Sequence, residues 1–182
     1  SGRSAIDITK SFENIGSKMS EYLTNPQALR NISRASILLA DASRMDIEEA
    51  TEGLTSLMNQ FGLKHDKALY LVNKLSAGED VGAATISQTI DMTRQFAASI
   101  RMAGGTAEEA IALVQATSKT MGNMGVGRGF RNIAIDMITG KGMDKNKQKA
   151  LAMVGADIDV ISAKSTHFYD RLKEIKKLLG NN

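Results

Sequence analysis

The stretch DIEEATEGLTSLMNQFG, residues 46–62, carries the signals of an amphipathic helix from end to end. Asp46 is a good N-cap residue, because its carboxylate can accept a hydrogen bond from the first backbone amides of a helix. Gly62 can adopt the left-handed conformation that ends a helix. Between them, apolar residues recur every three or four positions, which places their side chains on one helical face. These residues are Ile47, Ala50, Leu54, Leu57 and Phe61.

The composition extends this helical prediction to the whole chain. Its 182 residues include a single proline, Pro26, ten methionines and only 4% aromatic residues. Proline breaks helices, so its near-absence leaves helix as the favoured local state. The scarcity of aromatic and β-branched runs disfavours sheet. We therefore predict an all-α fold, a multi-helix bundle of about eight to nine helices, in a chain long enough to bury a core.

Helical periodicity divides the chain into three predicted segments. These are an N-terminal amphipathic helix (1–24), a helical core domain (25–163) and a C-terminal amphipathic helix of coiled-coil type (164–182). Within them we expect one unbroken helix over 5–23, another over 83–103, and a loop at 76–80. Further helices are expected over 64–75, 106–121, 130–138 and 144–154.

Capping residues mark several of these helix starts. Asn25 followed by Pro26 is a typical helix opening. Thr106 with Glu109 three residues later matches the reciprocal capping-box pattern. The capped stretch 106–122 also echoes 46–62: both have a cap residue, a Glu-Glu-Ala and a final glycine, which slightly favours a duplicated helical unit over chance.

Glycine is densest in MGNMGVGRGF, residues 121–130, at Gly122, Gly125, Gly127 and Gly129. A phosphate-binding loop would need lysine and a hydroxyl residue after the second glycine, and both are missing here. A dinucleotide fingerprint would need a preceding strand, whereas a helix is expected. We therefore interpret the four glycines as a hinge or packing loop between helices.

The sequence offers no set of residues typical of catalysis or cofactor binding. His65 and His167 are far apart and lack clustered carboxylates, so we expect no metal site. The acidic pairs at 48–49 and 108–109 fit the first turns of helices, where they favour the helix dipole. Cysteine is absent, which excludes thiol chemistry. We expect no enzyme activity and no cofactor.

Charge and hydropathy constrain the possible partners. The net charge is +3, too near neutral to indicate a nucleic-acid binder by itself. Apolar runs such as Ile37–Ala40 fall far short of the ~20 residues of a membrane helix, so we expect no membrane segment. One stretch is locally basic and could contact nucleic acid weakly, although a solvated helix face explains it as well. Its basic residues are Arg128, Arg131, Lys141, Lys145, Lys147 and Lys149.

A narrow apolar stripe near the C-terminus could support self-association. Its members, spaced as in a coiled coil, are Phe168, Leu172, Ile175 and Leu179. A second amphipathic stripe runs along the N-terminal helix, from Ile8 to Tyr22. These stripes could continue as a helical rod or pair with copies of themselves, so a homo-oligomer is predicted.

Several ordered motifs resemble one known family. The capped helix at 46–62 ends in Asn59-Gln60-Phe61-Gly62-Leu63, of the form Asn-x-Phe-Gly-Leu. A threonine- and serine-bearing helix start at 85–88 follows, then a Glu-Glu-Ala helix, a glycine-rich turn and an arginine-bearing helix over 106–137. LAMVGADIDV at 151–160 completes the order. Residues 35–160 thus resemble the shared core of phage tail tape measure proteins, with Met92–Phe96 replacing a stretch that usually carries glycine or proline.

This resemblance implies a structural protein of a phage or prophage tail. Such proteins lie along the tube lumen, set tail length during assembly and leave ahead of the DNA during infection. The chain would be one folded piece of a longer polypeptide, present in the host bacterial cytoplasm before assembly and in the virion tail afterwards. The implied partners are tail tube, tail assembly chaperone and baseplate proteins. The alternatives are a helical nucleic-acid-binding or regulatory adaptor and a peptidoglycan-cleaving enzyme.

Overall fold

The computed structural model describes residues 5–121, 126–153, 155–163 and 167–180. Every regular element within these ranges is helical, which confirms the predicted all-α fold. The long α-helices are α1 (Ala5–Lys18), α2 (Pro26–Ser43), α3 (Ile47–Phe61), α4 (Ala68–Val81), α5 (Ile86–Arg94), α7 (Ala107–Met121), α8 (Val126–Thr139), α9 (Lys145–Met153) and α11 (Phe168–Gly180). The short elements are α6 (Ala97–Met102), α10 (Ile158–Ile161), η1 (Ser20–Tyr22), η2 (His65–Lys67) and η3 (Gly140–Gly142).

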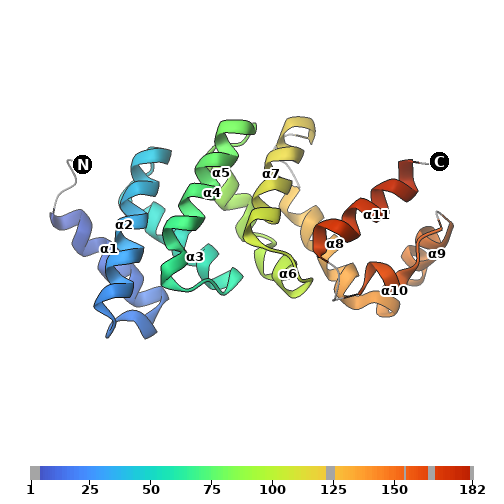
Figure 1. The fold of residues 1–182 in the computed structure, drawn as a ribbon, viewed down its shortest axis with the longest axis horizontal. Helices are drawn as coiled ribbons and strands as arrows, with labels where there is room; N and C mark the ends of the chain where they lie inside the picture. Colours follow the sequence, from blue (N-terminus) through green and yellow to red (C-terminus); the bar gives the residue numbers. More distant parts are fainter. Residues whose placement is uncertain (1–4, 122–125, 154, 164–166, 181–182) are drawn as a thin grey trace.

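From α1 to α8 the helices follow one another along the long axis of the molecule, α10 and the start of α11 turn back from α9 toward α8, and the two ends of the chain lie at opposite ends (Figure 1). Up to α8 they form two rows. The first row contains α1, α3, the α5–α6 pair and α8, and the second contains α2, α4 and α7. Helices α9, α10 and α11 complete the C-terminal end. The predicted bundle is therefore an elongated, two-row array.

Helix α3 lies at the centre of this array, in contact with α1, α2, α4, α5 and α6. Its start is fixed as expected, because the Asp46 Oδ1 accepts a hydrogen bond from the Glu49 amide at 2.7 Å. Its end is fixed by Gly62, which has a φ of +65°. Leu54 and Leu57 are completely buried. The stretch that predicts a helix most clearly is thus the one around which the others pack.

The remaining predicted caps are also confirmed. The Asn25 Oδ1 accepts hydrogen bonds from the amides of Gln27 and Ala28, at the start of α2. Thr106 and Glu109 form the reciprocal capping box of α7, at 3.2 and 2.8 Å. Each cap satisfies amide donors that have no partner inside the helix.

The first predicted helix ends earlier than expected. The sequence predicts one helix over 5–23, but α1 ends at Lys18 and η1 follows. Met19, between them, has φ −140° and ψ 60°, outside helical values, and its side chain is buried. The change of direction folds Leu23 back onto α1 beside Gly16. A side chain at position 16 would not fit there, because its Cβ would lie 2.7 Å from the Leu23 Cδ2.

Two other predicted boundaries are wrong. The expected loop at 76–80 is helical, because α4 continues to Val81. The expected helix over 83–103 is divided into α5 and α6 at Gln95 and Phe96. Phe96 is 1% exposed and lies against Phe130 of α8, with 5.3 Å between ring centroids. The break therefore follows from a contact between distant parts of the chain.

One hydrophobic core joins the predicted segments. Ile15 and Met19 from 1–24, and Phe168 from 164–182, belong to the same cluster of buried residues as the interior of 25–163. Within the described part of the chain, no helix has the length and apolar character needed to cross a membrane.

Candidate interaction surfaces

The glycine-rich stretch is shorter as a loop than predicted. Helix α8 begins at Val126 and not at residue 130, so Gly127 and Gly129 lie in its first turn. A Cβ at Gly127 would lie 2.6 Å from the Gln95 Oε1 and 2.9 Å from the Gln95 Cβ, so this glycine lets α8 pack closely on the α5–α6 junction. A Cβ at Gly129 would meet nothing within 4 Å. Gly122 and Gly125 lie outside the described residues, and the hinge role stays a prediction.

The predicted basic residues are all exposed, and two of the six form ion pairs. The Lys141 Nζ lies 2.7 Å from the Asp159 Oδ2, and the Lys147 Nζ lies 2.7 Å from the Asp136 Oδ2. The hydrogen bond and the charge of Asp159 raise the pKa of Lys141. Lys141 therefore joins η3 to α10, and Lys147 joins α9 to α8.

Four basic residues remain without an acidic partner in the described part of the chain. They are Arg128 and Arg131 on α8, and Lys145 and Lys149 on α9. The positive charge available to an anionic partner is thus smaller than the sequence count of six suggests. Contact with nucleic acid stays a prediction.

His65 belongs to a directed chain of hydrogen bonds between α2 and η2. The Arg30 Nη2 donates to the Gln27 Oε1, the Gln27 Nε2 donates to the Asn31 Oδ1, and the Asn31 Nδ2 lies 3.1 Å from the His65 Nδ1. A guanidinium can only donate hydrogen bonds, so it fixes the orientation of both amides. The His65 Nδ1 must then accept. The ring also meets Tyr22 edge-on, which gives His65 a packing role.

The other candidate chemical groups are dispersed. His167 is exposed just before α11, far in sequence from His65. Glu109 is used in the α7 capping box and accepts a hydrogen bond from the Tyr169 amide at 3.2 Å. Among the described residues, no cluster of three or more histidine, cysteine or acidic side chains could hold a metal ion.

The C-terminal stripe faces the interior of the molecule in large part. Phe168 is completely buried, and Leu172 and Ile175 pack against the hydrophobic core. The side chain of Leu179 lies outside the described residues. Self-association through this stripe stays a prediction, but most of its described surface already has contacts within the monomer.

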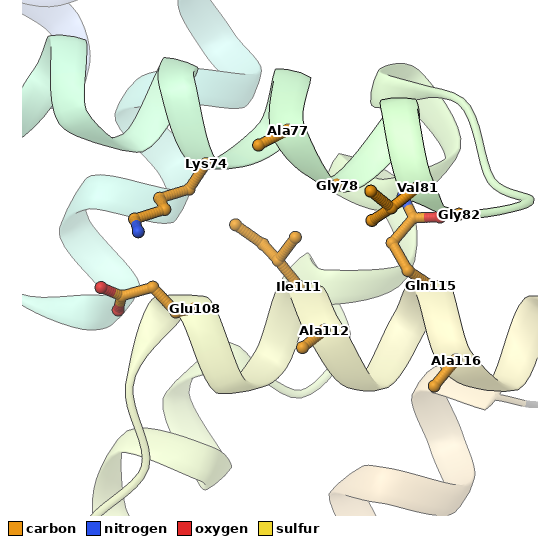
Figure 2. Close-up of a pocket in the computed structure, with 10 residues that line it drawn as sticks. All are labelled: Lys74, Ala77, Gly78, Val81, Gly82, Glu108, Ile111, Ala112, Gln115 and Ala116. Carbon is orange, nitrogen blue, oxygen red and sulfur yellow. The ribbon is translucent and has the colours of Figure 1, made fainter.

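The structure also contains an open groove between α4 and α7, with a volume of about 400 Å³ (Figure 2). Its floor and walls are mainly apolar and small: Ala77, Gly78, Val81, Gly82, Ile111, Ala112 and Ala116. Val81 is 71% exposed. The groove does not follow from the sequence pattern, because Gly78 and its neighbours predict a loop at 76–80. The spacing of Lys74, Ala77, Gly78 and Val81 along one helical face is the signal that could have revealed it.

One end of this groove carries two side chains of opposite charge. The other end carries a side-chain amide whose nitrogen and oxygen are both hydrogen-bonded within the protein. Lys74 and Glu108 point toward each other across the groove, but no ion pair joins them (Figure 2). At the other end, the Gln115 Nε2 donates to the Ala84 carbonyl at 3.0 Å and to the Thr89 Oγ1 at 2.7 Å, and its Oε1 accepts from the Ala84 amide. Gln115 thereby holds the α4–α5 turn against α7.

A smaller cavity of about 280 Å³ lies among α8, α9, α10 and α11, lined by residues such as Met137, Leu151 and Ile175. Near it, Arg171 is only 2% exposed. Its Nη1 donates to the Ile161 carbonyl at 3.3 Å and its guanidinium lies 5.9 Å from the centre of the Phe168 ring, while Nε and Nη2 have no hydrogen-bond partner among the described residues. Burial lowers the pKa of Arg171, and the charge of Glu109 opposes that effect.

Comparisons with known proteins give one match. A family model described as phage-related minor tail protein matches residues 1–182. The curated proteins and the solved structures contain no significant match to this chain. The matched range includes the glycine-rich stretch, the basic residues and the α4–α7 groove.

Proposed function

The chain belongs to the family of phage-related minor tail proteins, and from this premise we propose that it is a folded part of a tape measure protein. The family makes it a component of a phage tail. In the proposed role it helps to set tail length, assists assembly of the tail tube and leaves the tail during DNA delivery. It passes from the host cytoplasm into the virion.

One structural observation supports this role above the others: from α1 to α8 the helices advance along one axis, and the chain enters and leaves at opposite ends (Figure 1). In such an array each added helical unit contacts mainly its neighbours, so the length grows with the number of units. A polypeptide that continued on both sides would gain a fixed increment of length from this part. That property suits a protein whose own length determines the length of the tail tube.

We also propose that this part of the protein acts mechanically and has no catalytic activity. The described residues lack a metal-binding cluster, and the buried polar groups around Gln115 are used in packing. Its partners in this proposal are the tail tube, the tail assembly chaperone and the baseplate, which it contacts through exposed helical faces. A muralytic assay on the purified chain should show no cleavage of peptidoglycan.

Changes to the gene in a phage that carries it test the length-setting role. An in-frame deletion of the codons for 26–121, which removes α2 to α7, should shorten the tails, and an in-frame duplication of the same codons should lengthen them. Electron microscopy of purified virions measures both. An exposed substitution on α6, Ala98→Arg, should leave the tail length unchanged. Unaltered lengths in both rearranged phages, or absence of this polypeptide from purified tails, would contradict the proposal.

A second candidate function is weak DNA contact through Arg128, Arg131, Lys145 and Lys149, which have no acidic partner in the described part of the chain. Each phosphate contact contributes a slope of about −0.9 to the dependence of log affinity on log salt concentration. Arg128→Glu with Lys145→Glu should abolish a shift of DNA mobility seen at low salt. No shift for the unmodified chain at low salt would end this second proposal.

A further inference from the structure

Helices α4 and α7 run side by side in the same direction, and Lys74 and Glu108 point toward each other across their groove (Figure 2). Two glycines of the α4 side show how the two helices are aligned along the groove. A Cβ at Gly78 would lie 3.0 Å from the Ile111 Cγ2, and one at Gly82 would meet the Gln115 side chain. Lys74 therefore lies nearly level with Glu108, Ala77 lies between the levels of Glu108 and Ala112, and Val81 lies between the levels of Ala112 and Ala116.

The exposed residues on the two sides of the groove are complementary in charge and size. Lys74 and Glu108 have opposite charges and are half-buried without an ion pair between them. The Lys74 ammonium lies 5.3 Å from the centre of the Tyr70 ring. Ala77, Ala112 and Ala116 are small and exposed, and Val81 is exposed between the levels of Ala112 and Ala116. The basic group of α4 thus has an acidic group nearly level with it on α7, and the exposed apolar residues of the two helices alternate along the groove.

We propose that this face is the interface between two copies of the chain, related by a two-fold axis that runs along the groove. Such an axis exchanges the two sides of the groove and preserves the level along it. It therefore places α4 of one copy over α7 of the other, so that Lys74 meets the partner's Glu108 and Val81 fits between the partner's Ala112 and the partner's Ala116. In a two-fold interface every contact occurs twice.

The occupant is a second copy because the pattern is complementary to itself. A partner of different sequence would need an acidic and a basic group at these same levels, whereas a second copy supplies both. The small residues at the centre, with Gly78, allow the helices of the two copies to approach closely. This inference goes beyond the proposed function and does not rest on it, since self-association can be measured on the purified chain.

Sedimentation velocity on charge-reversed variants tests the axis directly. The unmodified chain should show a monomer–dimer equilibrium at concentrations up to a few hundred micromolar, which are chosen because the paired charges contribute little individually. Lys74→Glu or Glu108→Lys should each weaken the dimer by about tenfold or more, because each change turns two attractive pairs into repulsive ones. Each variant alone is therefore mostly monomeric.

Mixing the two variants is the decisive measurement. In a mixed dimer, the carboxylate introduced by Lys74→Glu would face the ammonium introduced by Glu108→Lys. At the other pair, the unaltered Glu108 of the first variant would face the unaltered Lys74 of the second, so attraction returns at both pairs. The mixture should dimerise within about threefold of the unmodified chain, since both pairs regain opposite charges. A mixture no stronger than the separate variants would overturn the proposed axis.

A steric variant provides a second readout that does not depend on charge pairing. Ala112→Arg, in the centre of the groove, should abolish dimerisation, whereas Ala98→Arg, on exposed α6 of the other row, should leave it unchanged. Circular dichroism checks that both variants remain helical. An unmodified chain that stays monomeric throughout the concentration range, or a dimer unaffected by Ala112→Arg, would overturn the proposal. Neither result would alter the tail-length experiment.

Discussion

Helices α2–α7 and helices α8–α11 are stabilised in different ways, although both parts are helical. In the first part, α3 buries Leu54, Leu57 and Phe61, and side-chain caps fix the starts of α2, α3, α5 and α7. In the second part, α9 has no buried residue among those described, and Met153 is 87% exposed. Exposed ion pairs join η3 to α10 and α8 to α9 there.

The largest buried polar side chains of the two parts show the same difference. Gln115 is 5% exposed, and three hydrogen bonds use its amide fully. Arg171 is 2% exposed, yet its Nε and Nη2 have no hydrogen-bond partner in the described part of the chain. A buried polar group that is fully paired orders its surroundings, whereas an unpaired one costs free energy. We infer that α2–α7 is the rigid part of the array and α8–α11 the less stable part.

Matched leucine deletions should give the largest effect. Leu54→Ala on α3 should lower the free energy of unfolding by about 3 kcal/mol, because it leaves a cavity in a completely buried site. Leu151→Ala on α9, which removes a half-buried side chain, should cost less than about 1 kcal/mol. Urea denaturation followed by circular dichroism measures both. Equal losses would show that the two parts are packed equally well.

Substitution of the two buried polar residues should give effects of opposite sign. Gln115→Leu leaves the buried amide and carbonyl of Ala84 unpaired and should cost about 2 kcal/mol. Arg171→Met removes a guanidinium with unpaired donors and should raise the free energy of unfolding by about 1 kcal/mol. Thermal and urea unfolding provide the comparison. A loss of stability in Arg171→Met would mean that this side chain is better paired than its contacts indicate.

Removal of the helix caps tests whether the two parts unfold together. Asp46→Ala at α3 should lower the global free energy of unfolding by about 1 kcal/mol. Asp144, whose Oδ1 accepts from the Asn146 amide at 2.9 Å, caps α9. Asp144→Ala should speed amide hydrogen exchange in α9 without moving the main unfolding transition. If Asp144→Ala shifts that transition as far as Asp46→Ala does, the two parts form one cooperative unit.

Local signals in the sequence predict the fold where they act within one helix. The caps at Asn25, Asp46 and Thr106 and the termination at Gly62 are all confirmed, because each depends on residues three or four positions away. The break at Phe96 could not be predicted in this way. No glycine or proline marks it, and it depends on Phe130, which lies on a different helix much further along the chain.

The same limit explains why the sequence analysis misses the α4–α7 groove. Gly78 suggests a turn in the sequence, since glycine commonly interrupts helices. In the folded chain it continues α4 and lets Ile111 approach to close contact. The role of Gly78 as a close contact between helices is evident only once α4 is seen to pack against α7. The basic residues are evident in the sequence, but the acidic partner of Lys141, Asp159, lies in a short helix that is not predicted, and the pairing of Lys147 with Asp136 depends on how two predicted helices pack.

The smallest predicted effect concerns the ion pair between α8 and α9. The Lys147 Nζ donates to both carboxylate oxygens of Asp136, at 2.8 and 2.7 Å. Both side chains are partly exposed, so Lys147→Met should cost only about 0.5 kcal/mol at low salt. Lys149→Met, two positions away on exposed α9, is the matched control and should change nothing. In 1 M salt, where the Debye length falls to about 3 Å, the difference between the two variants should disappear. A difference that persists at high salt would mean that Lys147 stabilises α9 by packing its aliphatic stem on α8, and the second part of the array would then be less dependent on charge than its contacts suggest.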